Sequence, residues 1–233
     1  AADPTVSQHA LTIDLDLQRS LEALAAEHAR ALGPKLSVAV LVVEHASGAV
    51  LAHVGSAGYL DNARFGAIDM TGAVRSPGST LKPLIYGLAF EQGLAHPETL
   101  IEDRPTRFES YAPKNFDDAF HGTVSIREAL QLSLNIPAVK VLAEVGPGRL
   151  MARLEAAGIE YSLPRGTEPS LAIALGGVGL RLRDLAGLYA GIARGGEPVR
   201  LVHRSRRREL YACCALRRVF QLQTENVRDA REA

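Results

Sequence analysis

A serine and a lysine three residues apart are the first side chains in this sequence that could do chemistry together. They are Ser79 and Lys82, within SPGSTLK at residues 76–82. Side chains three apart in a helix lie on one face, so the lysine amine can reach the serine hydroxyl. A lysine whose pKa is lowered by burial or by other cations can take the serine proton, which makes the hydroxyl a nucleophile. The competing interpretation is a serine that caps the helix and a lysine that points into solvent.

A serine and an asparagine two residues apart form the second pair. They are Ser133 and Asn135, about fifty residues downstream. Ser125 and Glu128 have the spacing of a capping box, which predicts a helix that starts there and ends before a break at residues 135–137. The pair therefore lies between two helices, where a hydroxyl and an amide can both face a cleft. The competing interpretation is that Asn135 caps the preceding helix and Ser133 has no role.

The hydrophobic pattern predicts a strand, a hairpin and several helices around these pairs. Residues 11–16 alternate apolar and polar side chains, as a half-buried strand does. A hairpin is predicted over residues 36–56, with Gly48 in its turn. Helices are predicted at residues 17–32, 80–92, 138–145, 148–157 and 182–194. Residues 96–123 hold several turn-forming clusters and are predicted to be an irregular excursion over the surface.

Composition argues against several classes of protein. The 233 residues are 47% hydrophobic and 22% charged, so the chain can bury a core. The formal net charge is zero, which argues against nucleic-acid binding and general membrane-surface binding. The longest aliphatic run, residues 38–43, is far below the ~20 residues that cross a bilayer, so no membrane segment is predicted. Residues 1–10 lack the features of a signal peptide and are predicted to be a linker.

Other clusters of functional residue types favour ordinary structural positions, and none predicts a metal site. The seven histidines show no metal-ligand spacing with cysteine or glutamate, so His45 and His53 are taken as residues that flank the hairpin turn. GGVG at residues 176–179 lacks the strand–helix context of a phosphate loop and is predicted to be a turn. Asp117 and Asp118 are adjacent in sequence, which favours a solvated loop over paired catalytic carboxylates.

Together, the two pairs resemble the Ser-x-x-Lys and Ser-x-Asn elements of penicillin-binding proteins and serine β-lactamases. The surrounding chain resembles the transpeptidase domain of bifunctional class A penicillin-binding proteins, most closely the subgroup called type one-C. The supporting stretches cover about residues 10–196 in the family's order: LTIDLDLQRSLEALA, VAVLVVEHASGAVLAHVGS, RSPGSTLKPLIYGLAFEQG, YAPKNFDDAFHGTVSIREALQLSLNIPAVKVL and ALGGVGLRLRDLAGLYAGIARGG. The resemblance implies an α/β (α+β) fold, with an antiparallel sheet flanked by helices and a helical subdomain.

The resemblance also implies a role for each of the four residues. Ser79 would attack the D-Ala-D-Ala carbonyl of a peptidoglycan stem peptide, with Lys82 as its base. Ser133 would pass a proton to the leaving amine, and Asn135 would hold Lys82 and the substrate amide. The amine of a neighbouring peptide would accept the acyl group, and β-lactams would acylate the same serine. The family uses no cofactor, and its site works on the periplasmic side of the bacterial inner membrane.

One element of the family pattern is missing from the 233 residues. No Lys-Thr-Gly is present, and the only lysines are Lys35, Lys82, Lys114 and Lys140. In the family this motif lies on a central strand that provides a cation for the substrate carboxylate and one oxyanion-hole N–H. We therefore expect residues 11–199 to form a partial transpeptidase domain, without its C-terminal sheet strands and with impaired catalysis.

Residues 200–233 match nothing in the family. They carry nine Lys or Arg against four Asp or Glu, both cysteines, and neither glycine nor proline. One hypothesis is a frameshifted or aberrant end; the other is an Arg-rich helix for an acidic partner, with an anion patch at residues 204–208. Two rival functions stay open for the whole chain: a serine β-lactamase, and a catalytically silent fragment or binding module.

Overall fold

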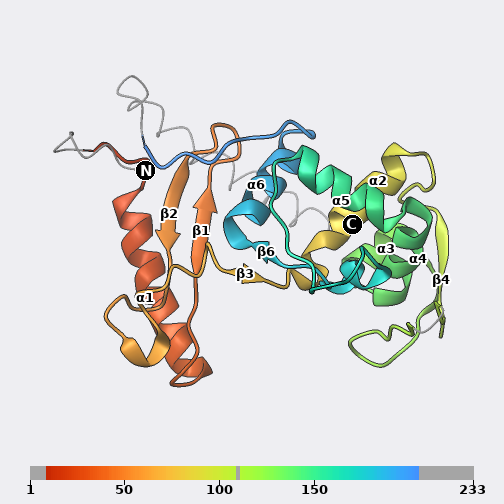
Figure 1. The fold of residues 1–233 in the computed structure, drawn as a ribbon, viewed down its shortest axis with the longest axis horizontal. Helices are drawn as coiled ribbons and strands as arrows, with labels where there is room; N and C mark the ends of the chain where they lie inside the picture. The colour runs from red at the N-terminus through yellow and green to blue at the C-terminus, as the bar shows by residue number, and fades with distance from the viewer. Residues whose placement is uncertain (1–8, 109–110, 205–233) are drawn as a thin grey trace, which may run out of the picture.

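A helix and a β-hairpin from the start of the chain lie beside a larger group of helices (Figure 1). The computed structural model describes residues 9–108 and 111–204. In chain order the helices and strands are α1 (Leu15–Leu32), β1 (Val40–Val43), β2 (Val50–Val54), β3 (Val74–Arg75), α2 (Lys82–Glu91), β4 (Leu100–Asp103), β5 (Gly122–Ser125), α3 (Ile126–Gln131), α4 (Asn135–Val145), α5 (Pro147–Ala156), β6 (Leu180–Arg181) and α6 (Leu182–Ala193). Short 3₁₀ helices lie between them: η1 (Asn62–Arg64), η2 (Gly78–Leu81) and η3 (Leu171–Leu175).

Helix α1 begins at an aspartate cap. The Asp14 carboxylate accepts hydrogen bonds from two backbone N–H groups of the first turn, both at 3.0 Å. The prediction of a strand over residues 11–16 is therefore wrong, because the cap starts the helix at Leu15 in the middle of the alternating pattern. The predicted end of this helix is confirmed, since α1 stops immediately before Gly33.

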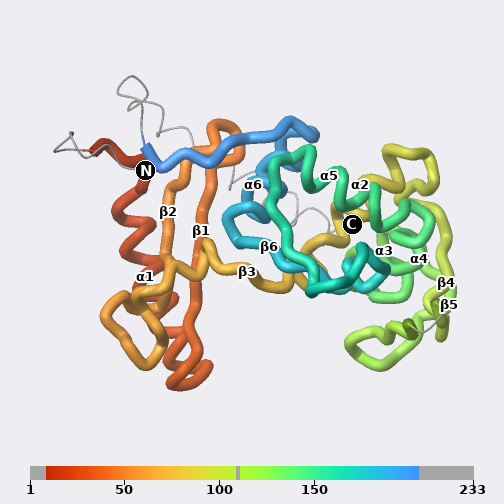
Figure 2. The backbone as a smooth tube through the Cα atoms, viewed as in Figure 1, coloured from red at the N-terminus to blue at the C-terminus, as the bar shows by residue number. Residues whose placement is uncertain are grey.

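The predicted hairpin is confirmed, with β1 paired antiparallel to β2. Alternate residues of β2 are buried, α1 packs against β2, and α6 packs against β1. The turn residue Gly48 has a φ of +75°, and a Cβ there would lie 2.3 Å from the backbone oxygen of Arg200. This close approach arises because residues 200–204 run beside β2, with the Val50 N–H donating to the Val202 carbonyl at 2.9 Å (Figure 2).

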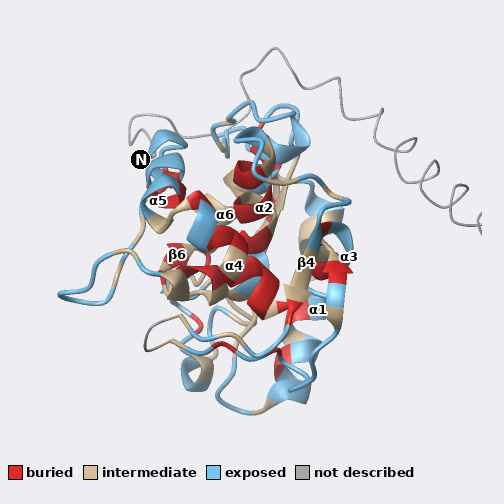
Figure 3. Ribbon diagram, turned by 90° about the vertical axis from the view of Figure 1, so that its right-hand side faces the viewer, coloured by how far each residue is buried: buried red, intermediate tan, exposed pale blue. Residues whose placement is uncertain are grey.

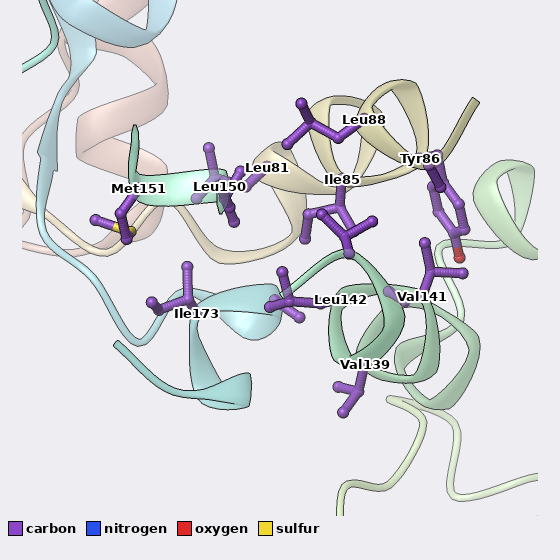
Figure 4. Packing of buried hydrophobic residues seen from close by; sticks show 14 of the residues in the cluster. Leu81, Ile85, Tyr86, Leu88, Val139, Val141, Leu142, Leu150, Met151 and Ile173 are labelled. Carbon is purple, nitrogen blue, oxygen red and sulfur yellow. The ribbon is translucent and has the colours of Figure 1, made fainter. Parts of the chain in front are cut away.

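The hydrophobic core centres on α4, which is apolar on nearly all sides. Seven of its residues are buried, and it packs against α2, α3, α5, β4 and η3. Figure 3 shows buried residues concentrated on α2 and α4, and Ile85 and Leu142 belong to this cluster (Figure 4). Because Lys82 and Asn135 are the first residues of α2 and α4, the packing of these helices fixes where both side chains begin.

The predicted helices are confirmed with small shifts at their ends. Helix α4 starts three residues earlier than predicted, because Pro137 falls in the first turn, where its missing N–H is tolerated. Helix α3 begins at the predicted cap, and the Ser125 hydroxyl accepts the Glu128 N–H at 3.2 Å. Helices α5 and α6 match their predicted ranges to within one residue.

A second hairpin lies in the stretch predicted to be irregular. Strands β4 and β5 pair antiparallel, with Leu100 opposite Ser125 and Asp103 opposite Gly122. The prediction of an irregular excursion over residues 96–123 is therefore wrong at both ends and fits only the loop that joins the strands. Each strand has four residues, too few for an alternating pattern to stand out among the turn residues around it.

The mixture of helices with antiparallel strands confirms the predicted fold class. Among the described residues the strands form the antiparallel pairs β1–β2, β3–β6 and β4–β5. No helix in this part of the chain has the length and apolarity of a membrane span. The predictions for residues 1–8 and for 205–233, which include most of the Arg-rich segment, lie outside the described residues.

Candidate active site

Ser79 and Lys82 lie one 3₁₀ turn apart where α2 begins. Ser79 is an exposed residue of η2, and its carbonyl accepts the backbone N–H of Lys82. A 3₁₀ helix has three residues per turn, so the two side chains leave the backbone on the same side. Pro83 follows in the first turn of α2, where a missing N–H costs little. The prediction of a helix that begins near Ser79 is therefore confirmed.

The Lys82 ammonium contacts both residues of the second pair. Its Nζ donates to the Ser133 carbonyl at 2.5 Å and to Asn135 Oδ1 at 2.7 Å, and it lies 3.2 Å from Ser133 Oγ. The fold therefore brings three of the four predicted residues into direct contact. The Ser79 hydroxyl is not among the hydrogen-bond partners of Nζ, although it lies one turn away.

Lys82 is almost fully buried, with 1% of its surface exposed. Burial disfavours the charged ammonium and lowers the pKa of Lys82 from 10.5 to about 8. The oxygen partners of Nζ are a carbonyl, a hydroxyl and an amide, so no carboxylate among them restores the usual pKa. A lysine with this pKa is partly neutral near pH 8 and can accept a proton, as a general base must.

Ser133 lies in a tight turn between α3 and α4. Its φ of +54° is in the left-handed region, which residues with a Cβ rarely adopt. The turn is closed by the Ser133 N–H, which donates to the Leu130 carbonyl at 3.1 Å. In this conformation both the carbonyl and the hydroxyl of Ser133 face Lys82. Backbone strain of this kind costs about 1–3 kcal/mol and clusters at functional sites.

Two contacts hold η2 from neighbouring elements. The Ser76 hydroxyl donates to the Gly176 carbonyl at 2.8 Å, and the Tyr189 hydroxyl of α6 donates to the Thr80 carbonyl at 2.9 Å. Gly176 has a φ of +93°, and a Cβ there would lie 2.6 Å from the backbone nitrogen of Gly78. Glycine at position 176 therefore lets the end of η3 approach the segment that carries the candidate nucleophile.

The side chains of Asn115 and Asp103 lie near the site, and the sequence pattern predicts no role for either of them. The Asn115 amide oxygen accepts the Asn135 N–H at 2.8 Å, and its amide nitrogen donates to both carboxylate oxygens of Asp103, at 2.9 and 2.8 Å. The neighbouring Lys114 carbonyl accepts Asn135 Nδ2 at 2.7 Å. Asn115 belongs to the stretch YAPKNFDD that supports the resemblance, but a single loop asparagine carries no spacing signal of its own.

The remaining candidates lie away from these residues. Within the described ranges no group of three or more His, Cys, Asp or Glu could hold a metal ion. His53 lies on β2, with its Nε2 3.2 Å from Asp69 Oδ1 and its Nδ1 3.3 Å from His203 Nε2. The GGVG segment forms a turn after η3, and Asp117 and Asp118 are exposed in a loop, as predicted.

A cavity of about 1020 Å³ has none of the four residues in its lining. Its walls come from α2, α5, α6 and residues 195–203, with Leu84, Leu188 and Arg153 among them. The candidate site is therefore defined by the hydrogen bonds of Lys82 and by its distance of one turn from Ser79.

The chain matches the family model described as the penicillin binding protein transpeptidase domain over residues 38–168, which include all four predicted site residues. Penicillin-binding protein 1C of Escherichia coli is 47% identical over 190 residues, covering 82% of this chain and 25% of that protein. Penicillin-binding protein 1F of Bacillus subtilis is 34% identical over 157 residues, covering 66% of this chain and 21% of that protein. The chain thus spans a quarter or less of the length of these two relatives.

Solved structures give the same result for the fold. The PonA1 protein from Mycobacterium tuberculosis, in complex with penicillin V, has a TM-score of 0.70 and 27% sequence identity, covering 85% of this chain and 54% of that chain. A second structure of PonA1 has a TM-score of 0.71 and 26% identity, covering 85% of this chain and 53% of that chain.

Proposed function

We propose, from the premise that this chain belongs to the penicillin-binding protein transpeptidase family, that Ser79 and the residues around Lys82 form an acyl-transfer site. The observation that carries the proposal is the contact of the buried Lys82 ammonium with Ser133 and Asn135, one 3₁₀ turn from Ser79. In this site Ser79 is the nucleophile, Lys82 its base, Ser133 a proton relay, and Asn135 the group that holds Lys82 and the substrate amide.

The proposed reaction begins when the Ser79 hydroxyl gives its proton to the neutral amine of Lys82. Ser79 Oγ attacks the carbonyl carbon of the D-Ala-D-Ala bond of a stem peptide, and the C–N bond breaks. The leaving D-Ala amine receives a proton from Ser133, which Lys82 replenishes across the 3.2 Å between Nζ and Oγ. The amine of a neighbouring stem peptide then attacks the carbonyl carbon of the acyl-enzyme, and the ester bond to Ser79 Oγ breaks. The proton that the amine loses returns to Ser79 Oγ through Ser133 and Lys82, so the cross-link forms and Ser79 is free again.

The pKa of Lys82 supports its role as the base. At a pKa of about 8 the amine is neutral in roughly one molecule in ten at pH 7, against fewer than one in a thousand for an ordinary lysine. The same residue, once protonated, is an acid strong enough to return the proton to Ser133. A base poised near the working pH is what proton transfer in both directions requires.

The substrate and the location follow from the same proposal. The substrate class is a peptidoglycan stem peptide that ends in D-Ala-D-Ala, and β-lactams such as penicillin acylate the same serine. The domain occupies residues 11–199 and works on the periplasmic side of the inner membrane, where such peptides are cross-linked.

We expect acylation by these 233 residues to be slow. The sequence contains no Lys-Thr-Gly, the family motif that supplies a cation for the substrate carboxylate and one oxyanion-hole N–H. The loss of one such donor typically lowers kcat by ~10²–10³. The acylation rate is therefore expected to be lower by at least that factor than in a relative that carries the motif.

Labelling with a fluorescent penicillin, read by intact mass, tests the proposal. We expect a one-to-one adduct that forms slowly, is absent from Ser79→Ala and persists in Thr80→Val, which removes the neighbouring hydroxyl. Penicillin-binding protein 1C of Escherichia coli serves as the rate reference. No adduct in a protein that unfolds cooperatively would contradict acyl transfer and favour a silent binding module. Repeated turnover of a chromogenic cephalosporin would instead favour a serine β-lactamase.

A further inference from the structure

A chain of buried polar side chains leads from β4 to the candidate site. Asp103, the last residue of β4, is fully buried, and Asn115 is 5% exposed. The Asp103 carboxylate accepts hydrogen bonds from Asn115 Nδ2 on both oxygens and from the His121 N–H at 2.8 Å. A carboxylate buried to this degree is costly unless such bonds satisfy it, so the arrangement constrains Asn115 strongly.

Asn115 uses both ends of its amide, and its partners allow only one orientation. Its oxygen accepts the Asn135 N–H at 2.8 Å, while its nitrogen donates to Asp103 and to the Ala119 carbonyl at 2.8 Å. A flipped amide would set oxygen against carboxylate and carbonyl, and would set an NH₂ against an N–H. The Asp103 carboxylate therefore determines that the Asn115 oxygen faces the start of α4.

Asn115 also supplies a helix cap that the local sequence does not provide. The residue before α4 is Leu134, whose side chain makes no cap hydrogen bond. The first N–H groups of a helix have no partner within the helix, and Asn115 satisfies that of Asn135 from a loop twenty residues earlier. The adjacent Lys114 carbonyl binds Asn135 Nδ2 at 2.7 Å. Two consecutive residues thus hold the backbone and the side chain of Asn135.

We propose that Asn115, anchored by Asp103, is a positioning residue of the acyl-transfer site, which orients Asn135 so that its Oδ1 holds Lys82. Asn135 Oδ1 faces Nζ because the other end of its amide is bound to Lys114. Without the Asn115 side chain, the Asn135 N–H loses its partner and the loop that presents the Lys114 carbonyl loses its anchor on Asp103. The side-chain amide of Asn135 is then no longer held with Oδ1 toward Nζ, and the ammonium loses an oxygen acceptor. The inference rests on the proposed function in naming Lys82 as the base, but its test observes Lys82 directly.

The expected consequence is a change in the pH at which Lys82 loses its proton. Oxygen acceptors stabilise the ammonium form, so the loss of one lowers the titration midpoint of a lysine that stays buried. A hydrogen bond to a charged group is strong enough to move the midpoint by about one pH unit. A purely structural role for Asn115 would reduce stability and leave the midpoint in the folded protein unchanged.

Nuclear magnetic resonance of lysine side chains measures this midpoint. The chain has four lysines, so protein labelled with ¹³C at lysine Cε gives few signals, and Lys82→Met identifies the one from Lys82. We expect Asn115→Ala to lower the Lys82 midpoint by about one pH unit relative to the unsubstituted protein. The matched control is Phe116→Ala, the adjacent side chain, which is fully exposed and should leave the midpoint unchanged.

A second variant covers the case in which Asn115→Ala does not fold. Asp103→Asn keeps the shape of the side chain and removes the charge that anchors Asn115, and we expect it to lower the midpoint by about half a pH unit. An unchanged or raised midpoint in whichever of the two variants folds overturns the inference. Penicillin labelling of the unsubstituted protein is measured in parallel. If Ser79 is not labelled, the proposed function fails, while a lowered midpoint still supports the positioning role.

Discussion

The buried lysine should make the protein more stable as the pH rises from 7 to 9.5. In the folded protein the pKa of Lys82 is about 8, whereas an unfolded lysine has a pKa of about 10.4. Between these values the unfolded chain binds more protons than the folded protein, so raising the pH favours the folded state. The destabilisation that comes from burying the ammonium is present at pH 7 and is lost as the pH rises beyond 8.

The size of the effect follows from the distance between the two pKa values. Each unit corresponds to 1.36 kcal/mol, so the charged form of Lys82 costs about 3 kcal/mol at pH 7. At pH 9.5 the unfolded lysine is still largely protonated, so the free energy of unfolding rises by about 2 of these 3 kcal/mol between pH 7 and 9.5. Burial, helped by the Asp103 carboxylate, raises the pKa of the Tyr86 hydroxyl, so above pH 10 tyrosine ionisation favours the unfolded state. The measurement therefore stops at pH 9.5.

Urea unfolding followed by circular dichroism at several pH values measures this dependence. Circular dichroism is the suitable probe because the chain contains no tryptophan. Lys82→Met keeps an unbranched side chain, one atom shorter, and removes the titrating group, and it is measured at the same pH values. The difference between the two proteins, followed across pH, isolates the contribution of Lys82, whatever the absolute stability of the variant.

Two outcomes would contradict the predicted rise in stability. A difference that stays flat between pH 7 and 9.5 would mean that Lys82 binds protons equally in both states, so burial would not perturb it. A difference that falls with pH would mean that the folded protein favours the ammonium, as a paired carboxylate would cause. Either result would also remove the physical basis for Lys82 as a base near neutral pH.

Three further predictions concern packing, and the same urea unfolding checks each. Gly176→Ala should lower the free energy of unfolding by about 3 kcal/mol or more, and Gly158→Ala should lower it by about 1 kcal/mol. Both glycines have a positive φ, but of the two only Gly176 would place a Cβ within 3 Å of other atoms. Equal losses in the two variants would contradict this prediction. Leu142→Ala, in the core on α4, should cost about 2–5 kcal/mol. Tyr86→Phe should raise the free energy of unfolding by about 1 kcal/mol, because the buried hydroxyl has no hydrogen-bond partner among the described residues. A lower free energy of unfolding would show that the hydroxyl has a hydrogen-bond partner.

The sequence predicts those elements whose pattern is long or whose ends are marked. Helix α1 repeats apolar residues over several turns and ends before a glycine, and the β1–β2 hairpin has two alternating runs around Gly48. Residues 11–16 show the limit of this reasoning. Their apolar and polar side chains do alternate, but Asp14 caps a helix that starts within them, through two hydrogen bonds of 3.0 Å. The cap stabilises the helix, whereas the alternation covers only six residues and does not specify a strand.

The site was only partly predictable for a related reason. The spacing of Ser79 and Lys82 predicts their common side, because it depends on one turn of chain. The contact between Lys82 and Asn135 spans 53 residues, and only the family resemblance implied it before the structure was known. The bond from Asn115 to Asn135 depends on how the β4–β5 loop returns to α4, which no local pattern encodes.

Burial alone lowers the pKa of Lys82, because it disfavours the charged ammonium. A carboxylate in direct contact would cancel this effect, raise the pKa of Lys82 and remove the base. The buried carboxylate of Asp103 is instead separated from Lys82 by the neutral amides of Asn115 and Asn135. The hydrogen bonds of Asn115 and Asn135 thus link the position of Lys82 to that of Asp103, while the Asp103 carboxylate itself does not contact the Lys82 ammonium.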